Sequence, residues 1–240
     1  SFYLSQGVSE ERMISAPHGV DNRRFAEQAR SMQGQRRAFR KAWHIPENAF
    51  CFLFLGKLIT KKRPSDLVRA VKELEKQNFD RPLHILFVGT GELAHELRQS
   101  CKISFDYENQ VGGGEAPNAS FVGFLNQTDV SQAYVAADCL VLPSEATETW
   151  GLVVNEAMAS GLPCIVSDAC GCVEDLVLPI CPQLSYPIGD IHRLQDAMKK
   201  VMTCPPPSKI LRQHVDDYSL LRTVEAVEHA YNEAIIRTAA

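Results

Sequence analysis

The chain has 240 residues, of which 45% are apolar, and its formal net charge is −4 with an isoelectric point near 6.0. This length and composition suit one large α/β domain, or two small ones, with a sizeable core. The acidic balance argues against nucleic acid as a main partner, because no dominant basic field is present to neutralise a phosphate backbone.

Membrane and export signals are weak in this sequence. No apolar run approaches the ~20 residues that cross a bilayer, so we expect no transmembrane helix. The chain begins with Ser and lacks the basic start and apolar core of a signal peptide, a pattern compatible with a fragment of a longer protein. We therefore expect a cytoplasmic protein.

The strand and helix signals alternate along the chain. Continuous apolar runs predict strands at 50–55, 84–88, 120–122, 139–142, 164–166 and, more weakly, 184–186. Helical periodicity predicts helices at 65–77, 92–99, 129–137, 151–160 and 190–202, with N-caps at Asp129 and Asp190. This alternation predicts an α/β fold with a doubly wound parallel sheet, Rossmann-like in type.

The remaining segments read as connections and a terminal helix. Gly112–Gly114 make 106–118 the best candidate for a mobile insertion. Three prolines at 205–207 interrupt the chain before an amphipathic helix from Ser219 to about Ile236, whose apolar stripe needs a packing partner. The basic clusters at 36–41 and 61–63 are expected to be solvated faces.

The eight cysteines do not form the pattern of a disulfide scaffold. Three of them lie in or beside apolar runs and are expected to be reduced core residues: Cys51, Cys139 and Cys164. Cys170 and Cys172 are close in sequence, but paired C-x-x-C knuckles and a spaced histidine pair are missing. We expect neither a metal nor another cofactor.

Two glutamates eight residues apart are the most informative feature. Glu148 follows the strand at 139–142 in a loop, and Glu156 lies about one turn inside the next helix. In an open α/β sheet, ligands bind at such strand ends. The loop carboxylate can meet a sugar hydroxyl, the free N–H groups at Gly151 and Leu152 can cradle phosphate, and Glu156 can accept from a ribose diol. The sequence therefore suggests a nucleotide-sugar site, with a solvated acidic face as the alternative.

Taken in order, several motifs resemble the family-four glycosyltransferases, specifically the donor-binding C-terminal half of their two-Rossmann-domain fold. The resemblance covers nearly the whole chain, and an ordered set is far more specific than any single motif. Its marks are Pro17–Asp21, Gly56–Leu58 with Lys62, Val88–Leu93, Phe121–Leu125, Glu148–Ala159, and Ser167–Asp168 with Gly171.

The resemblance implies a role for each matching residue. Lys57 and Lys62 face the pyrophosphate, where metal-free departure of a nucleoside diphosphate needs cations; two solvated lysines are the alternative. Glu148 faces the sugar and steadies charge at the anomeric carbon, while Glu156 binds the ribose. Further donor contacts are implied at Gly56, Gly89, Gly91, Leu125, Trp150, Gly151 and Leu152. Several of these positions have an alternative explanation. The glycines can simply form turns, Trp150 can form a wall of the pocket, and Phe124 can belong to the core.

Three departures from the family pattern leave the donor undetermined. Lys57 stands where arginine is common and replaces a bidentate fork with a point charge. His18 replaces a usual asparagine, and Cys170 replaces the first glycine of a pair. On family frequency we favour UDP-hexose, such as UDP-glucose.

The family reaction transfers a sugar from a nucleotide donor to an acceptor hydroxyl, usually with retention, in polysaccharide or glycoconjugate biosynthesis. By resemblance, residues 1–20 are an interdomain connection or remnant of the N-terminal domain, and residues 21–240 are the donor domain with its C-terminal helix. An absent N-terminal half would supply the acceptor site, for a glycan or lipid-linked sugar, and any membrane association. Little activity is expected of this chain alone.

Other function classes remain open to different degrees. A nicotinamide-dependent oxidoreductase needs Gly-x-Gly-x-x-Gly after its first strand, whereas Gly56-Lys57-Leu58 follows here. A non-catalytic nucleotide-sugar-binding module would keep the same glutamates and lysines. A sugar-nucleotide epimerase would share the architecture, and product analysis with donor alone would separate it from a transferase.

Overall fold

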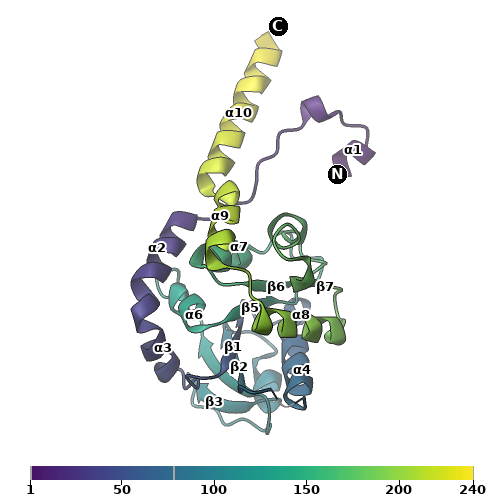
Figure 1. The fold of residues 1–240 in the computed structure, drawn as a ribbon. Coiled ribbons are helices and arrows are strands. Elements are labelled where there is room, and N and C mark those ends of the chain that lie inside the picture. The colour runs from purple at the N-terminus through teal and green to yellow at the C-terminus, as the bar shows by residue number, and fades with distance from the viewer. Residues whose placement is uncertain (1, 78, 240) are drawn as a thin grey trace.

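A single parallel sheet forms the centre of the protein (Figure 1). The computed structural model describes residues 2–77 and 79–239, and within them seven strands run in the order β3-β4-β2-β1-β5-β6-β7, with every pairing parallel. The strands are β1 (Phe50–Leu55), β2 (Leu83–Val88), β3 (Lys102–Asp106), β4 (Asn118–Gly123), β5 (Cys139–Leu142), β6 (Cys164–Ser167) and β7 (Ser185–Tyr186).

Helices cover both faces of this sheet. On one face α4, α5 and α8 pack together, and on the other α2, α3, α6, α7 and α9 do so. The predicted doubly wound, Rossmann-like fold is therefore confirmed. The helices are α1 (Phe2–Ser5), α2 (Asn22–Met32), α3 (Arg36–Ala42), α4 (Pro64–Glu75), α5 (Ala94–Gln99), α6 (Val130–Ala136), α7 (Leu152–Ser160), α8 (Ile191–Thr203), α9 (Ser208–Val215) and α10 (Leu220–Ala239).

The buried strands were predicted well, and of the two edge strands β7 was predicted weakly and β3 was missed. The predicted bounds 50–55 and 139–142 coincide with β1 and β5, which are almost wholly buried and so read as continuous apolar runs. β3 lies at the sheet edge, and its sequence Lys-Ile-Ser-Phe-Asp has too few apolar residues to signal a strand. Asp190 caps α8 as predicted, accepting from the Arg193 N–H at 3.0 Å, whereas the Asp129 side chain does not cap α6.

Two arginines of the first basic cluster, Arg36 and Arg40, are structural, so the predicted solvated face was wrong for them, whereas Arg37 and Lys41 are exposed as predicted. Arg40 is 4% exposed, and its Nη2 lies 2.6 Å from Asp138 Oδ2 at the start of β5. Arg36 Nη2 donates to the other oxygen of that carboxylate at 2.8 Å. Sequence reasoning also missed α2 and α3, because their many arginines hid the apolar face that packs on α6 and α7.

The three glycines of the loop between β3 and β4 lie against the chain at the end of α5. A Cβ atom at Gly112 or Gly114 would overlap backbone atoms of residues 100–101, and Gly114 N–H donates to Cys101 O at 3.3 Å. Close backbone approach therefore accounts for Gly112 and Gly114, and the mobility of this loop stays a prediction.

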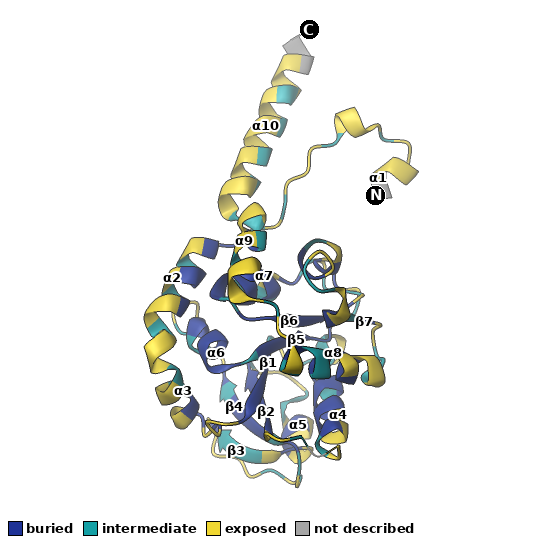
Figure 2. Cartoon of the chain, viewed as in Figure 1, coloured by how far each residue is buried: buried dark blue, intermediate teal, exposed yellow. Residues whose placement is uncertain are grey.

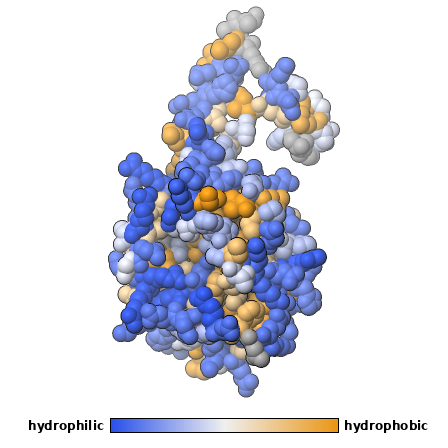
Figure 3. Space-filling view, in the orientation of Figure 1, coloured by the Kyte–Doolittle hydropathy of each residue, from blue (hydrophilic) through white to orange (hydrophobic). Residues whose placement is uncertain are grey.

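The two ends of the chain project together from the body (Figure 1). They cross where Val20 bridges Ser219, at a contact so close that any side chain at Gly19 would overlap Ser219. Beyond the crossing α10 is largely exposed (Figure 2), and apolar side chains interrupt its polar surface (Figure 3). The apolar stripe expected for this helix is exposed: Leu220, Leu221, Val224, Val227, Tyr231, Ile235 and Ile236. No described helix is long and apolar enough to cross a membrane.

Candidate functional site

The strand order of the sheet reverses between β1 and β5. Strands β2, β4 and β3 extend the sheet from one side of β1, while β5, β6 and β7 extend it from the other. The crevice outside the carboxyl ends of two such strands is where doubly wound sheets bind ligands. The loops that follow β1 and β5 carry Lys57, Lys62 and Glu148.

Lys62 and Glu148 meet at this point although 86 positions separate them in the numbering of the chain. The Lys62 ammonium contacts Glu148 Oε2, and the two side chains are 26% and 15% exposed. The two loops are also joined through their backbones, since Glu145 N–H donates to Lys61 O at 2.9 Å. Burial, reinforced by the neighbouring charge of Lys61, lowers the pKa of Lys62. The cation and the carboxylate therefore lie together at one edge of the sheet, and their separate roles toward pyrophosphate and sugar stay predictions.

Lys57 is placed differently. It is exposed in the turn directly after β1, and within the described residues it forms no ion pair. Its charge is available to a ligand at the same edge of the sheet.

Glycines bring the loops after β1 and β2 into backbone contact. Gly56 and Gly89 have φ angles of +148° and +130°, which side chains rarely adopt. Gly56 N–H donates to Val88 O and Leu58 N–H to Thr90 O, each at 2.9 Å. A Cβ at Gly89 would overlap Gly56 O, and a Cβ at Gly91 would overlap Leu58 O. Contact between the two loops thus explains these glycines, and their approach to a nucleotide stays a prediction.

The start of α7 is held at the same edge by the loop after β6. Gly151 precedes the helix with φ +107°, and Leu152 is 46% exposed. Gly171 N–H donates to Glu148 O at 3.1 Å, and any side chain at Gly171 would overlap Thr149 O. The first N–H groups of a helix have no partner within it, so this fixed helix start is suited to an anion.

Glu156 lies one turn further along α7 and is partly buried. Tyr134 Oη donates to Glu156 Oε2 at 2.6 Å. Burial raises the pKa of Glu156, while the Tyr134 hydrogen bond and the charge of Arg24 act in the opposite direction. Sequence reasoning singled out Glu156 but missed Tyr134 and Arg24, because nothing local in the sequence links three different helices.

Trp150 belongs to an aromatic cluster with His18 and Tyr218. Its ring centroid lies 5.2 Å from that of His18 and 5.9 Å from that of Tyr218. Its Nε1 donates to Asn155 Oδ1 at 2.8 Å, and Asn155 is fully buried. Asn155 was also missed, although a polar residue within Leu-Val-Val-Asn-Glu-Ala-Met-Ala was a usable signal. The cluster joins the loop of Glu148 to the crossing of the two chain ends.

Phe124 and Leu125 follow β4 at the neighbouring strand end. Phe124 is 79% exposed, so the core position considered for it was wrong. Leu125 packs partly against the core. Gly123 O, just before them, accepts from Gly89 N–H at 2.7 Å and so ties this loop to the other two.

The cysteines behave as predicted for a core. Cys51, Cys139 and Cys164 are buried free thiols, and burial raises the pKa of Cys51 to about 12. Cys170 and Cys172 are buried too, and Cys170 Sγ lies 3.4 Å from Ser167 Oγ. Among the described residues, no three His, Cys, Asp or Glu side chains converge as they would round a metal ion.

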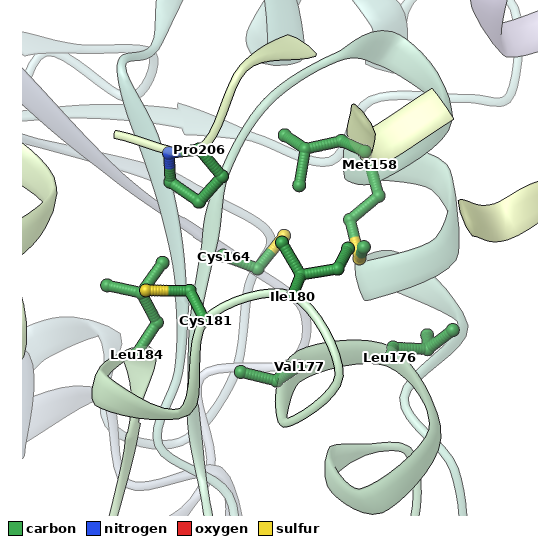
Figure 4. A pocket seen from close by; sticks show the side chains of 9 residues that line it. Met158, Cys164, Leu176, Val177, Ile180, Cys181, Leu184 and Pro206 are labelled. Atoms are coloured by element: carbon green, nitrogen blue, oxygen red, sulfur yellow. The ribbon is translucent and has the colours of Figure 1, made fainter. Parts of the chain in front are cut away.

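An apolar recess elsewhere in the protein does not compete with this site. Met158, Cys164, Ile180 and Pro206 are among the side chains that line it (Figure 4). Its volume of about 10 Å³ is at the lower limit for one water molecule. A recess of this size cannot hold a nucleotide.

Comparison with known proteins identifies the family. A model described as "Glycosyl transferases group 1" matches residues 35–219. This match covers well over half of the sequence, so the chain belongs to the group 1 glycosyltransferase family, as the motifs indicated.

Two of the curated relatives described below have a donor in their names, and the two donors differ. A D-inositol 3-phosphate glycosyltransferase of Saccharomonospora viridis is 30% identical over 226 residues, which are 90% of this chain and 49% of that protein. A GDP-mannose-dependent alpha-mannosyltransferase of Mycobacterium tuberculosis is 30% identical over 81% of this chain and 43% of its own length. A UDP-Gal:alpha-D-GlcNAc-diphosphoundecaprenol alpha-1,3-galactosyltransferase of Escherichia coli is 29% identical over 68% and 38%. The chain spans about half the length of the curated relatives it matches.

Solved structures agree on the fold. A glycosyltransferase from Rickettsia africae ESF-5 superimposes with a TM-score of 0.73 at 17% identity, over 98% of this chain and 62% of that one. WaaG, described as a glycosyltransferase involved in lipopolysaccharide biosynthesis, gives a TM-score of 0.63 at 21% identity over 92% and 57%. At these identities the likeness concerns the fold alone.

Proposed function

We propose that this chain binds a nucleotide-diphosphate sugar and is the donor domain of a glycosyltransferase. The observation that carries the proposal is the meeting of Lys62 and Glu148 between the ends of β1 and β5, with Glu156 on the helix that follows. The cation and the start of α7 then match the pyrophosphate of one ligand. The two carboxylates match its sugar and its ribose. Residues 21–240 would form this domain, and residues 1–20 would connect it to an N-terminal half that holds the acceptor.

The chemistry asked of these residues is electrostatic. When the nucleoside diphosphate leaves, negative charge grows on the pyrophosphate, and Lys57 and Lys62 would stabilise it together with the N–H groups of Gly151 and Leu152. Positive charge grows at the anomeric carbon, and Glu148 would stabilise it from the other side. We also propose that the sugar is transferred to an acceptor hydroxyl with retention and without a metal ion.

Lys62 and Glu148 neutralise one another. A diphosphate would draw the ammonium away from Glu148 and so release this carboxylate for the sugar. The same two charges would thereby act on one another and then on the ligand.

We favour a UDP-hexose, such as UDP-glucose, as the donor, and a glycan or lipid-linked sugar as the acceptor. Relatives that name GDP-mannose and UDP-Gal support a nucleotide-sugar donor of this general kind. All eight cysteines lie among the described residues as free thiols, which fits the proposed cytoplasmic location.

A thermal-shift panel of UDP-, GDP- and ADP-sugars tests the proposal. A ligand at 100 times its dissociation constant should stabilise the folded chain by about 2.7 kcal/mol. We expect the largest shift with a UDP-sugar. Absence of any shift at millimolar concentration, in protein shown to be folded, would contradict the proposal.

A further inference from the structure

Glu156 is surrounded by side chains from two other helices. Tyr134 of α6 is 3% exposed and donates from Oη to Glu156 Oε2 at 2.6 Å. The Tyr134 ring packs edge to face on Phe25 of α2, with centroids 6.0 Å apart. The hydroxyl therefore has little freedom to move, and it fixes one oxygen of the carboxylate.

Arg24 lies on the Phe25 ring that packs against Tyr134, and it also contacts the loop after β4. Its guanidinium lies 4.4 Å above the centroid of Phe25, and its Nη1 donates to Gln127 O at 3.1 Å. Its charge acts favourably on the ionised form of Glu156. Arg24 thus contacts the loop that carries Leu125, and its charge favours the ionised form of Glu156.

Other groups near this cluster are already engaged. Arg212 of α9 donates to the backbone carbonyls of Ala159 and Ser160, and Ser160 Oγ donates to Glu156 O. Cys164 of β6 is the remaining titratable group that acts on Tyr134. Tyr134 therefore orients the Glu156 side chain, and the charge of Arg24 favours its ionised form.

A charged residue at this position has a cost that a neutral one would avoid. Burial disfavours ionised Glu156, whereas a glutamine could accept the same hydrogen bond from Tyr134 without that cost. Residues whose ionisation is disfavoured by burial yet supported by a placed cation are concentrated at functional sites. The negative charge is thus kept for a ligand and not for packing.

We propose that Tyr134 and Arg24 are positioning residues for nucleoside recognition. Tyr134 holds Oε2 of Glu156 and leaves Oε1 to the ribose diol. Arg24 keeps the carboxylate charged and, through Gln127, holds the loop against which the base would lie. This inference rests on the proposed function, because it assigns a supporting role within the same site.

Two conservative variants with matched controls test it. Tyr134→Phe removes the hydroxyl and keeps the ring, with Tyr107→Phe as the control at an exposed tyrosine. Arg24→Gln removes the charge, with Arg23→Gln as the control, because the Arg23 side chain is 87% exposed. Calorimetry would measure the affinity of the 240-residue chain for UDP, GDP, uridine, guanosine and inorganic pyrophosphate.

We expect each test variant to bind the preferred nucleoside about ten-fold more weakly, the loss typical of a charge-assisted hydrogen bond. The loss should grow between about pH 7.5 and about pH 5.5, because without its supporting partner Glu156 takes up a proton at higher pH. Affinity for pyrophosphate should stay within two-fold, and both controls should match the parent chain. Equal losses for pyrophosphate and nucleoside would overturn the inference, as would unchanged nucleoside affinity and pH profile.

A ligand-free measurement separates this inference from the proposed function. Carboxyl ¹³C shifts would follow the ionisation of Glu156 in the parent chain and both variants. The midpoint should rise in Tyr134→Phe and in Arg24→Gln but not in the controls, whether or not a nucleotide binds. An unchanged midpoint in both variants would overturn the inference, whereas failure of UDP, GDP and ADP all to bind the parent chain would overturn the proposed function instead.

Discussion

Charged side chains are partly buried at both ends of the parallel sheet, but they are satisfied in different ways. At the amino end Arg40 donates to Ala136 O at 2.9 Å and to Ala49 O at 3.1 Å besides pairing with Asp138, and Asp138 also accepts from Cys51 N–H at 2.8 Å. At the carboxyl end, within the described residues, the Lys62 side chain contacts Glu148 without a backbone carbonyl. The charged groups at the amino end have all found hydrogen-bond partners, so this cluster stabilises the fold. The ion pair at the carboxyl end keeps unused donors and acceptors, so it can exchange one partner for a ligand.

The largest effect is expected at the amino end. Arg40→Ala would leave Asp138 and several carbonyls without their donor, so it should lower the free energy of unfolding by about 3–5 kcal/mol. Urea unfolding measures this loss. Arg37→Ala is the matched control, because the Arg37 and Glu47 side chains are 82% and 68% exposed, and it should cost less than about 1 kcal/mol. Equal effects of the two changes would show that the amino-end cluster is not structural.

At the carboxyl end the corresponding change should affect binding more than folding. Lys62→Ala should weaken UDP or GDP binding by about 1.5–3 kcal/mol, because a charge-assisted contact to the pyrophosphate is lost. Uridine and guanosine should bind almost as before, and added salt should reproduce part of the loss.

Calorimetry with nucleoside and nucleoside diphosphate side by side makes this measurement, and Lys61→Ala at the exposed neighbour is the control. Parallel losses for uridine and UDP would mean that Lys62 acts through packing, and the contrast between the two ends of the sheet would fail.

Glu148→Gln should strengthen the binding of UDP, whereas Lys62→Ala should weaken it. The change frees Lys62 from its partner, so UDP without a sugar should bind the 240-residue chain more tightly by about 0.5–1 kcal/mol, the worth of a partly exposed ion pair. In a protein that also contains the acceptor half, the same change should lower turnover more than donor affinity, because it removes charge needed in the transition state. Weaker UDP binding by the variant would show that Glu148 does not compete for Lys62.

The smallest effect concerns stability and pH at Glu156. Its pKa is raised in the folded chain by burial, so this carboxyl group contributes stability below its unfolded pKa and loses it as pH rises through the folded value. Glu156→Gln should therefore match the parent chain in acid and exceed it near neutral pH by about 0.5 kcal/mol, while nucleoside binding weakens. Thermal unfolding across pH tests this. A variant less stable than the parent at neutral pH would mean that the charge of Glu156 stabilises the fold.

The sequence predicted the parts of this molecule that are encoded locally. β1 and β5 were found with their observed bounds because buried parallel strands are continuous apolar runs. The placement of Lys62 and Glu148 at one edge of the sheet could be expected because the residues after such strands face a common edge, while their roles stay predictions. The partners of buried charges were not found, since Arg40 meets Asp138, and Tyr134 meets Glu156, only through packing of distant segments. That same lack of a local signal led Arg36 and Arg40 to be assigned to a solvated face.

The most direct test of the central claim is to map where a nucleoside diphosphate binds. Amide shifts of the ¹⁵N-labelled chain would be followed during titration with UDP and, separately, GDP. We predict that the perturbed amides gather at the carboxyl edge of the sheet, in residues 56–62, 89–91, 124–125 and 148–156. Perturbations gathered instead at the amino end, round Arg36 and Arg40, or no saturable perturbation at all in the folded chain, would contradict the account.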